Sequence, residues 1–282
     1  MTNENQPQPG SGTTREMHYI SGYSPANVQH LANRTVAHYA AFFLPHLRAG
    51  MSLLDCGCGP GTITIGLAQT VAPGQVVGID IEPSMVDRAS ALGREHGLSN
   101  VRFQVANVFQ LPFPEGSFDA VFAHALLQHL DQPLRALKEM RRVLKSDGVI
   151  GIRAADHGGR IIAPANKILE DYYHLRGRIR QHHGGGEMRF SRQLRSLLRQ
   201  AGFVRIEASA SYDYYGTPAD THAEAQSRIA RIESRPAFED AVAEGWVERA
   251  TLEKMITAWE KWGEDPDAFC ADAKCEAVGW KE

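Results

Sequence analysis

Short apolar runs alternate with amphipathic helical stretches through the middle of the chain. The apolar runs occupy residues 53–54, 76–79, 101–105, 118–122 and 149–152, and the helical stretches occupy 62–71, 84–96 and 133–145. Strands and helices that alternate at this spacing are typical of a parallel sheet covered by helices on both faces, with right-handed crossovers. We therefore predict an α/β fold of the Rossmann type.

The alternation continues to the C-terminus with one interruption. A polar stretch rich in glycine and histidine contains one amphipathic helix at about 163–180, and we interpret residues 155–190 as an inserted helical lid. Its apolar side chains are expected to wall a pocket: Ile161, Ile162, Ile168, Leu169 and Tyr172. A helix at 191–201, a strand at 203–210, helices at 220–244 and 251–262, and a strand at 268–278 follow. The predicted sheet is thus seven-stranded and mostly parallel.

The N-terminal part precedes this alternation. Residues 1–15 are polar and rich in Pro, Gly and Thr, which is typical of a disordered tail and unlike a secretion signal. Ser24-Pro25 is typical of a helix start, and apolar residues at helical spacing extend this helix over about five turns to Pro45. We expect a helical cap over residues 16–50.

Composition and charge narrow the class of protein. The 282 residues are 43% hydrophobic and 22% charged, as in ordinary globular domains, and we expect a single domain over 16–282. A net charge of −3 argues against a nucleic-acid surface, and no apolar run is long enough to predict a membrane span. The four cysteines are too few for a disulfide framework in a chain of this length, so we expect a cytoplasmic protein.

A glycine-rich turn, Asp55-Cys56-Gly57-Cys58-Gly59-Pro60-Gly61-Thr62, follows the first predicted strand. Its glycines let the backbone turn tightly and approach a ligand where a Cβ would collide. Because the turn opens a helix, its free amides and the positive end of the helix dipole favour an anionic or electron-rich ligand. Glycines are also common in turns that bind nothing, so the turn alone leaves that interpretation open.

Three neighbouring features favour a nucleoside ligand other than a nicotinamide dinucleotide. The dinucleotide pattern Gly-x-Gly-x-x-Gly starting at Gly57 requires glycine at position 62, where this chain has Thr62. The next strand ends at Asp80, about 20 residues on, where a carboxylate can accept hydrogen bonds from both hydroxyls of a ribose. Asp55 precedes the glycines and can order the turn or bind an ammonium group.

The turn resembles motif I of class I S-adenosylmethionine-dependent methyltransferases, particularly those of ubiquinone and menaquinone biosynthesis. Gln110-Leu111-Pro112-Phe113-Pro114 with Ser117-Phe118-Asp119 resembles the family's Leu-Pro-Phe and Ser-Phe-Asp segment. Arg142-Val143-Leu144-Lys145 with Asp147-Gly148 resembles its Arg-Val-Leu-Lys-Pro-Gly-Gly. Together these ordered blocks are specific, and they identify residues 51–154 as a cofactor-binding core.

The resemblance implies S-adenosylmethionine as the cofactor and assigns its contacts. The glycines of the turn would pass under the methionine portion, Asp80 would hold the ribose and Ile81 would lie against the adenine. Asn107 stands where the family commonly has the Asp that reads the adenine amino group, and its side-chain carbonyl can still accept from that group. The implied cofactor residues are Tyr23, Asp55, Gly57, Cys58, Gly59, Gly61, Asp80, Ile81, Asn107, Val108 and His124. For Tyr23, simple packing against the first helix remains an equal alternative.

Methyl transfer from a sulfonium is an in-line displacement, so it depends mainly on positioning, and a dedicated base is optional. His124, His157 and Tyr173 are the titratable candidates for a base. Aromatic residues in the variable segments 155–190 and 210–265 suit a small lipophilic or aromatic acceptor, although core packing explains most of them. The second segment lies in the C-terminal part of the fold (191–282). Cys56-x-Cys58 and His182-His183 lack the spacing or the partners of a metal site.

Three alternatives remain at this level. A methyltransferase fold can bind the cofactor yet serve as a non-catalytic partner or sensor, because fold does not determine function. An NAD-dependent oxidoreductase is disfavoured by Thr62. A third alternative is an enzyme that uses the sulfonium cofactor without transferring its methyl group.

Overall fold

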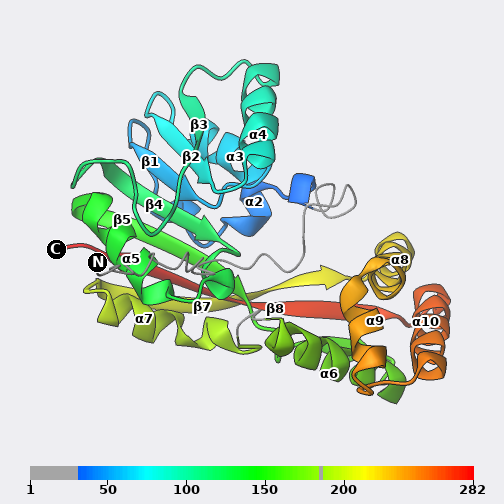
Figure 1. Cartoon of the computed structure of the whole chain (residues 1–282). Coiled ribbons are helices and arrows are strands. Elements are labelled where there is room, and N and C mark those ends of the chain that lie inside the picture. Colours follow the sequence, from blue (N-terminus) through cyan, green and yellow to red (C-terminus); the bar gives the residue numbers. More distant parts are fainter. Residues whose placement is uncertain (1–30, 184–186) are drawn as a thin grey trace, which may run out of the picture.

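The computed structural model describes residues 31–183 and 187–282, in which an eight-stranded sheet forms the centre (Figure 1). Five parallel strands in the order β3-β2-β1-β4-β5 are followed by β8, which runs antiparallel to β5 and also pairs with β6 and β7. The strands are β1 (Leu53–Cys56), β2 (Val76–Asp80), β3 (Val101–Val105), β4 (Phe118–His124), β5 (Leu144–Ala155), β6 (Ile161–Ala163), β7 (Val204–Tyr215) and β8 (Phe269–Trp280).

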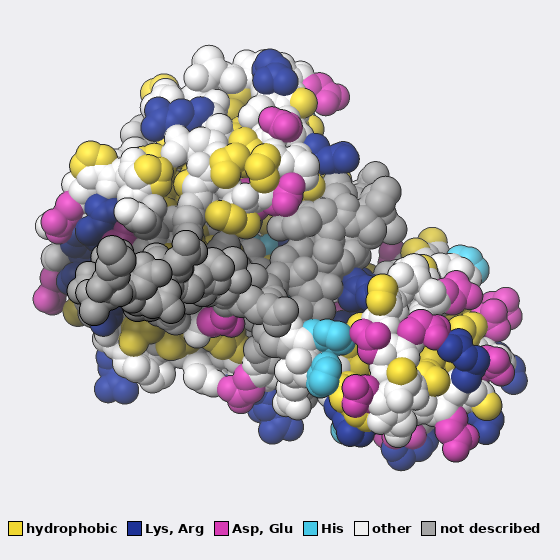
Figure 2. Space-filling view, in the orientation of Figure 1, with side chains coloured by type: hydrophobic (Ala, Val, Ile, Leu, Met, Phe, Trp, Pro, Cys, Tyr) yellow, Lys and Arg dark blue, Asp and Glu magenta, His cyan; other side chains and the backbone are white. Residues whose placement is uncertain are grey.

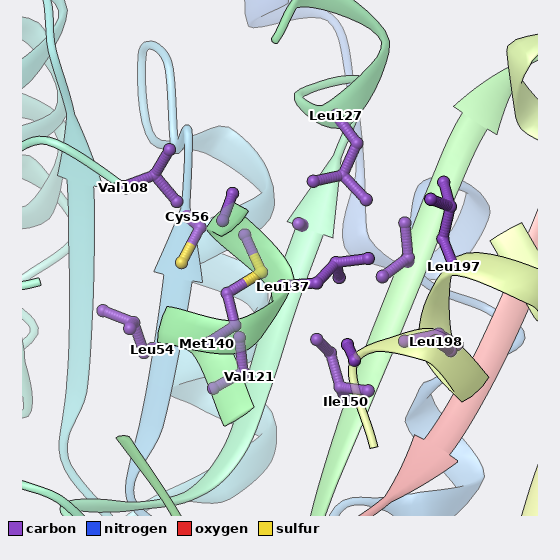
Figure 3. Close-up of a cluster of buried hydrophobic side chains, with 14 of the residues drawn as sticks. Leu54, Cys56, Val108, Val121, Leu127, Leu137, Met140, Ile150, Leu197 and Leu198 are labelled. Atoms are coloured by element: carbon purple, nitrogen blue, oxygen red, sulfur yellow. The ribbon is translucent and has the colours of Figure 1, made fainter. Parts of the chain in front are cut away.

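Successive side chains of a strand point to opposite faces of the sheet, and apolar side chains occupy both faces here. Helices therefore cover both faces. These helices are α2 (Val36–Tyr39), α3 (Thr62–Val71), α4 (Pro83–Glu95), α5 (Pro133–Val143) and α7 (Leu194–Gln200). Leu53 packs in a core with α2 and α3, whereas Leu54 packs in the core on the other face with α5 and α7. Figure 3 shows this second core, where Leu54, Val121 and Ile150 of the sheet lie beside Met140 of α5.

A second group of helices packs at the far end of β7 and β8, away from the parallel strands (Figure 1). It consists of α6 (Lys167–His182), α8 (Pro218–Ser234), α9 (Pro236–Ala243) and α10 (Arg249–Glu264), and we call it the helical unit. Tyr172 of α6 is fully buried there, stacked on Phe238 of α9 and edge-on to Trp259 of α10. Among the described helices, none combines the length and the apolar character that crossing a membrane requires.

The predicted alternation of strands and helices is confirmed, with three differences in the C-terminal half. The helix predicted at 220–244 is wrong, because Pro236 lacks an N–H and disfavours a helical residue before it, so α8 and α9 separate at Arg235. The helix predicted to begin at 163 begins at Lys167, after Asn166, whose side chain caps it. The residues just before it form β6, the eighth strand.

The N-terminal cap also differs from its prediction. The predicted helix start at Ser24-Pro25 lies outside the described residues, as does the tail at 1–15. A continuous helix up to Pro45 is wrong, because within the described residues the helical conformation is interrupted at 33–35, after which the chain forms the short α2 and a 3-10 turn at Leu44–His46. Between them, Phe43 stacks on Phe122 of the sheet with 5.6 Å between the ring centroids, so tertiary packing overrides the helical periodicity here.

Candidate active site

The glycine-rich turn crosses the carboxyl end of β1 and opens α3. Gly59 and Gly61 both have positive φ, at 53° and 89°. A Cβ on Gly61 would lie 2.7 Å from the Cβ of Ala89, so Gly61 serves the packing of α3 on α4. A Cβ on Gly59 would meet nothing within 4 Å, and Gly59 lines a cavity. The turn therefore leaves free space beside Gly59 that a ligand can fill.

Asp80, at the end of β2, is fastened to this turn. Its Oδ2 accepts a hydrogen bond from the Gly59 N–H at 2.9 Å, and its Oδ1 accepts one from the Glu82 N–H at 3.0 Å. Burial raises the pKa of the Asp80 carboxyl, although these backbone bonds oppose the rise. Each oxygen keeps a lone pair for a further donor, so Asp80 can accept two more hydroxyl bonds.

Asp55, at the end of β1, lies deeper beneath the same turn. It is 3% exposed, and its Oδ2 accepts a hydrogen bond from the Thr64 hydroxyl at 2.6 Å. Burial raises the pKa of Asp55 to about 7; the Thr64 bond opposes this effect, and the nearby Asp80 adds to it. A cationic ligand beside Asp55 would therefore favour loss of its proton.

The residues after β2 and β3 complete this end of the cavity. Ile81 is 45% exposed although it is apolar, and it lines the cavity with Ala106 and Val108. Asn107 is not among the lining residues, and its Oδ1 accepts a hydrogen bond from the Phe109 N–H at 2.9 Å. The structure thus places the exposed apolar side chain of Ile81 at the cavity. The side-chain carbonyl of Asn107 instead binds the backbone of its own loop.

His124, at the end of β4, also lines the cavity. Its ring nitrogens lie 3.4 Å from a terminal nitrogen of Arg34 and 3.3 Å from one of Arg153. Burial, followed by these two guanidinium groups, holds the pKa of His124 well below its usual range. The imidazole is therefore neutral at pH 7 and a poor proton acceptor.

His157 and Tyr173, the other candidate bases, lie in different surroundings. His157 follows β5 and lines the cavity, and its buried Nε2 has no hydrogen-bond partner among the described residues. Burial and the neighbouring Arg176 and Arg180 hold the pKa of His157 well below its usual range. The structure does not bring Tyr173 to the cavity; the Arg160 guanidinium lies over its ring at 3.6 Å, and burial raises the pKa of its phenol.

The remaining site predictions fall on the turn and on the N-terminal cap. Gly57 and Cys58 line the cavity, whereas Gly61 does not. Cys56 points into the core beside Leu54 (Figure 3), and burial raises the pKa of its thiol well above the usual value. It therefore fills apolar space as a protonated thiol. Tyr23 lies outside the described residues.

The cavity extends from this turn to the helical unit and has a volume of about 480 Å³. Its far end is formed by charged residues that the sequence interpretation did not select: Arg160, Arg176, Arg180, Asp213, Glu224, Arg228, Arg231, Asp272 and Lys274. The only signal in the sequence is their spacing, since Arg176 and Arg180 are four apart and share a helix face. Spacing alone does not show that this face turns inward.

The apolar wall predicted for the lid is wrong. Ile161 and Ile168 are 47% and 39% exposed, and Leu169 and Tyr172 are buried in the core of the helical unit. None of these four residues, nor Ile162, lines the cavity. Because the apolar face of α6 packs on its neighbouring helices, its polar face with the arginines forms the wall.

Comparisons with known proteins identify the family. Residues 47–202, more than half of the chain, match the model of a methyltransferase domain family. The chain is 30% identical to the probable methyltransferase ltbC of Aspergillus luteorubrus, over 96% of this chain and 100% of that protein. The chain therefore belongs to the methyltransferase domain family, as its motifs indicated.

Solved structures share the fold. The YcgJ protein of Bacillus subtilis has a TM-score of 0.58 at 22% identity, covering 87% of this chain and 99% of that one. Phosphoethanolamine N-methyltransferase 2 of Haemonchus contortus, solved with phosphomonomethylethanolamine and S-adenosylhomocysteine, has a TM-score of 0.50 at 20% identity, covering 83% of this chain and 50% of that one. The protein is a methyltransferase with a Rossmann-like fold.

Proposed function

We propose that this methyltransferase transfers the methyl group of S-adenosylmethionine to a small metabolite by in-line displacement. One observation carries the proposal: the same cavity is lined by the glycine-rich turn at one end and by polar residues of the helical unit at the other. Its volume of about 480 Å³ lies within the range of small-molecule sites. Cofactor and acceptor would thus meet in one cavity.

The cofactor end fits the chemistry of S-adenosylmethionine. The space beside Gly59 would receive the methionine portion, and the two free lone pairs of Asp80 would accept the ribose hydroxyls. The exposed apolar surface of Ile81 would lie against the adenine, with the Val108 backbone nearby. Asp55 would face the positively charged part of the cofactor. These roles use each group as it is positioned, without rearrangement of the turn.

The described residues supply positioning rather than a strong base. The bound cofactor supplies the electrophilic methyl group and the leaving group. His124 and His157 are neutral at pH 7, and their lowered pKa values mean that neither would retain a proton taken from the acceptor. The Nε2 of His157, which has no partner in the described chain, can still hydrogen-bond to the acceptor, whereas both ring nitrogens of His124 already lie beside guanidinium groups. The rate would then come mainly from alignment and from exclusion of water.

The acceptor end would be covered by residues 155–190 acting together with α8, α9 and α10. Tyr172 of α6 is locked between Phe238 and Trp259, so α6 cannot move alone without opening that core. We therefore place the insertion in a helical cover shared with the C-terminal part, and not in a separately hinged flap. The predicted lipophilic or aromatic acceptor has less support. Among the described Phe, Trp and Tyr residues of 155–190 and 210–265, only Tyr215 lines the cavity.

The test is incubation of the protein with S-adenosylmethionine and a metabolite extract, followed by mass spectrometry. The expected result is a product heavier than one extract component by a single methylene unit, together with S-adenosylhomocysteine. Asp80→Ala, which removes the ribose contact, is the matched control and should form little product. Tight binding of S-adenosylhomocysteine without a methylated product from any extract would instead support a partner or sensor.

A further inference from the structure

Positive charge is concentrated at the helical end of the cavity. Six cationic side chains and three carboxylates line it: Arg160, Arg176, Arg180, Arg228, Arg231 and Lys274, against Asp213, Glu224 and Asp272. The whole chain has a net charge of −3, so this excess is local. On the face seen in Figure 2, the outer surface of the helical unit carries both signs of charge. The imbalance is therefore a property of this end of the cavity, which differs from the surface around it.

The three carboxylates are already paired. Asp272 forms an ion pair with Arg160, and its Oδ2 lies 3.3 Å from a terminal nitrogen of Arg228. Glu224 forms an ion pair with Arg228, one helical turn away. The Oδ2 of Asp213 lies 3.2 Å from the Nζ of Lys274. Within residues 31–183 and 187–282, Arg176, Arg180 and Arg231 have no carboxylate partner. Three guanidinium groups thus remain uncompensated at one end of one cavity.

These three arginines are half-buried in the wall of the cavity. Burial, followed by neighbouring guanidinium groups, lowers the pKa of all three, and it does so to about 10 for Arg180 and Arg231. Burial of an unpaired charge is unfavourable, and like charges close together add to the cost. Unpaired charges of one sign in a cavity are typical of a site that binds a ligand of opposite charge.

Unused hydrogen-bond donors lie in the same place. Arg180 donates from one terminal nitrogen to the Gln128 carbonyl at 3.1 Å, but its Nε is buried without an acceptor in the described chain. The Nε of Arg228 is also buried without one. The Nε2 of His157 is buried without a partner in the described chain, and it is a donor in one of the two neutral tautomers. All three residues line the cavity. Acceptor atoms are therefore missing where positive charge is in excess.

We propose that the methyl acceptor carries an anionic oxygen group, a carboxylate or a phosphate, that binds between α6 and α8 to Arg176, Arg180 and Arg231. Planar guanidinium groups match either anion through paired N–H bonds. This inference rests on the proposed function, and it names the acceptor class for the same cavity. The anion would anchor the acceptor at the helical end, so that its nucleophile reaches toward the turn.

The test measures binding of small probes to protein saturated with S-adenosylhomocysteine. The probes are benzoate, phenyl phosphate and the neutral benzamide, and the method is calorimetry or ligand-observed NMR. At least one anion should bind and benzamide should not, and the anion that binds identifies the group. Arg231→Gln and Arg176→Gln should each weaken anion binding at least tenfold. Arg178→Gln, an exposed arginine on α6 outside the cavity, should leave it unchanged.

Folding and cofactor binding are followed in the same samples. Arg231→Gln removes an unpaired, half-buried charge, so its melting temperature without ligand should equal or exceed that of the parent protein. Binding of S-adenosylhomocysteine should persist in all variants. If the cofactor product binds but neither anion does, or if benzamide binds equally well, the anionic acceptor is refuted and the methyltransferase proposal stands. If the parent protein does not bind S-adenosylhomocysteine, the result instead counts against the proposed cofactor site.

Discussion

Replacing Asp55 with asparagine should stabilise the protein without ligand and weaken its hold on the cofactor. Asp55 is buried under the glycine-rich turn, and burial raises its pKa from 3.8 to about 7. Asparagine has nearly the same shape, and its Oδ1 can still accept the hydrogen bond from Thr64. The substitution therefore removes the titration while it keeps the main contact.

The sign and size follow from linkage between protonation and folding. Below pH 3.8, Asp55 is protonated in the folded and unfolded states, so it contributes no pH dependence. Between pH 3.8 and about 7, only the unfolded state ionises, and the free energy of unfolding falls by about 1.4 kcal/mol per pH unit. The total is at most about 4 kcal/mol, and above pH 7 it is constant. Asp55→Asn should thus gain stability progressively from pH 4 to pH 7.

Urea unfolding of the parent protein and Asp55→Asn, at pH values from 5 to 8, measures this difference. Asp119→Asn is the matched control, because bonds to Lys145 and Ser52 outweigh burial and lower the pKa of Asp119. The stability that Asp119→Asn loses should therefore be the same at every pH from 5 to 8, because the folded and unfolded pKa values of Asp119 both lie below that range. Equal stability of the Asp55→Asn and parent proteins at pH 8 would refute the assignment of a raised pKa to Asp55.

Three further predictions concern the cofactor and the helical cover. Asp80→Ala should weaken S-adenosylhomocysteine binding by about 1.5–3 kcal/mol in calorimetry, the usual worth of hydrogen bonds to a charged group, and unchanged affinity would remove Asp80 from the ribose site. Gly59→Val should abolish binding by filling the space beside the turn, whereas Gly97→Val, also at positive φ with open space around it, should keep it. In hydrogen exchange, α6 should be strongly protected with and without S-adenosylhomocysteine, because it belongs to the core of the helical unit. A gain of protection by α6 alone would favour a hinged lid.

Local sequence was sufficient to predict the Rossmann-like half of the fold. Predicted strands at 76–79 and 101–105 coincide with β2 and β3, and the helix predicted at 62–71 coincides with α3. In these segments the period of apolar residues and the position of the glycine turn agree with the tertiary structure. The cofactor end of the cavity could be predicted for the same reason, since Asp80 and Ile81 come directly after the predicted strand at 76–79.

Only the tertiary structure determined the acceptor end. Arg176 and Arg231 are far apart in the sequence, and each lies on a helix whose polar face would ordinarily be solvated. Packing of the apolar faces of α6 and α8 onto α9 and α10 turns those polar faces toward the cavity. Likewise, the Asn107 carbonyl binds its own loop, and Phe43 leaves the helical pattern to stack on the sheet. Such choices depend on which distant surfaces meet, and periodicity along the chain carries no information about that.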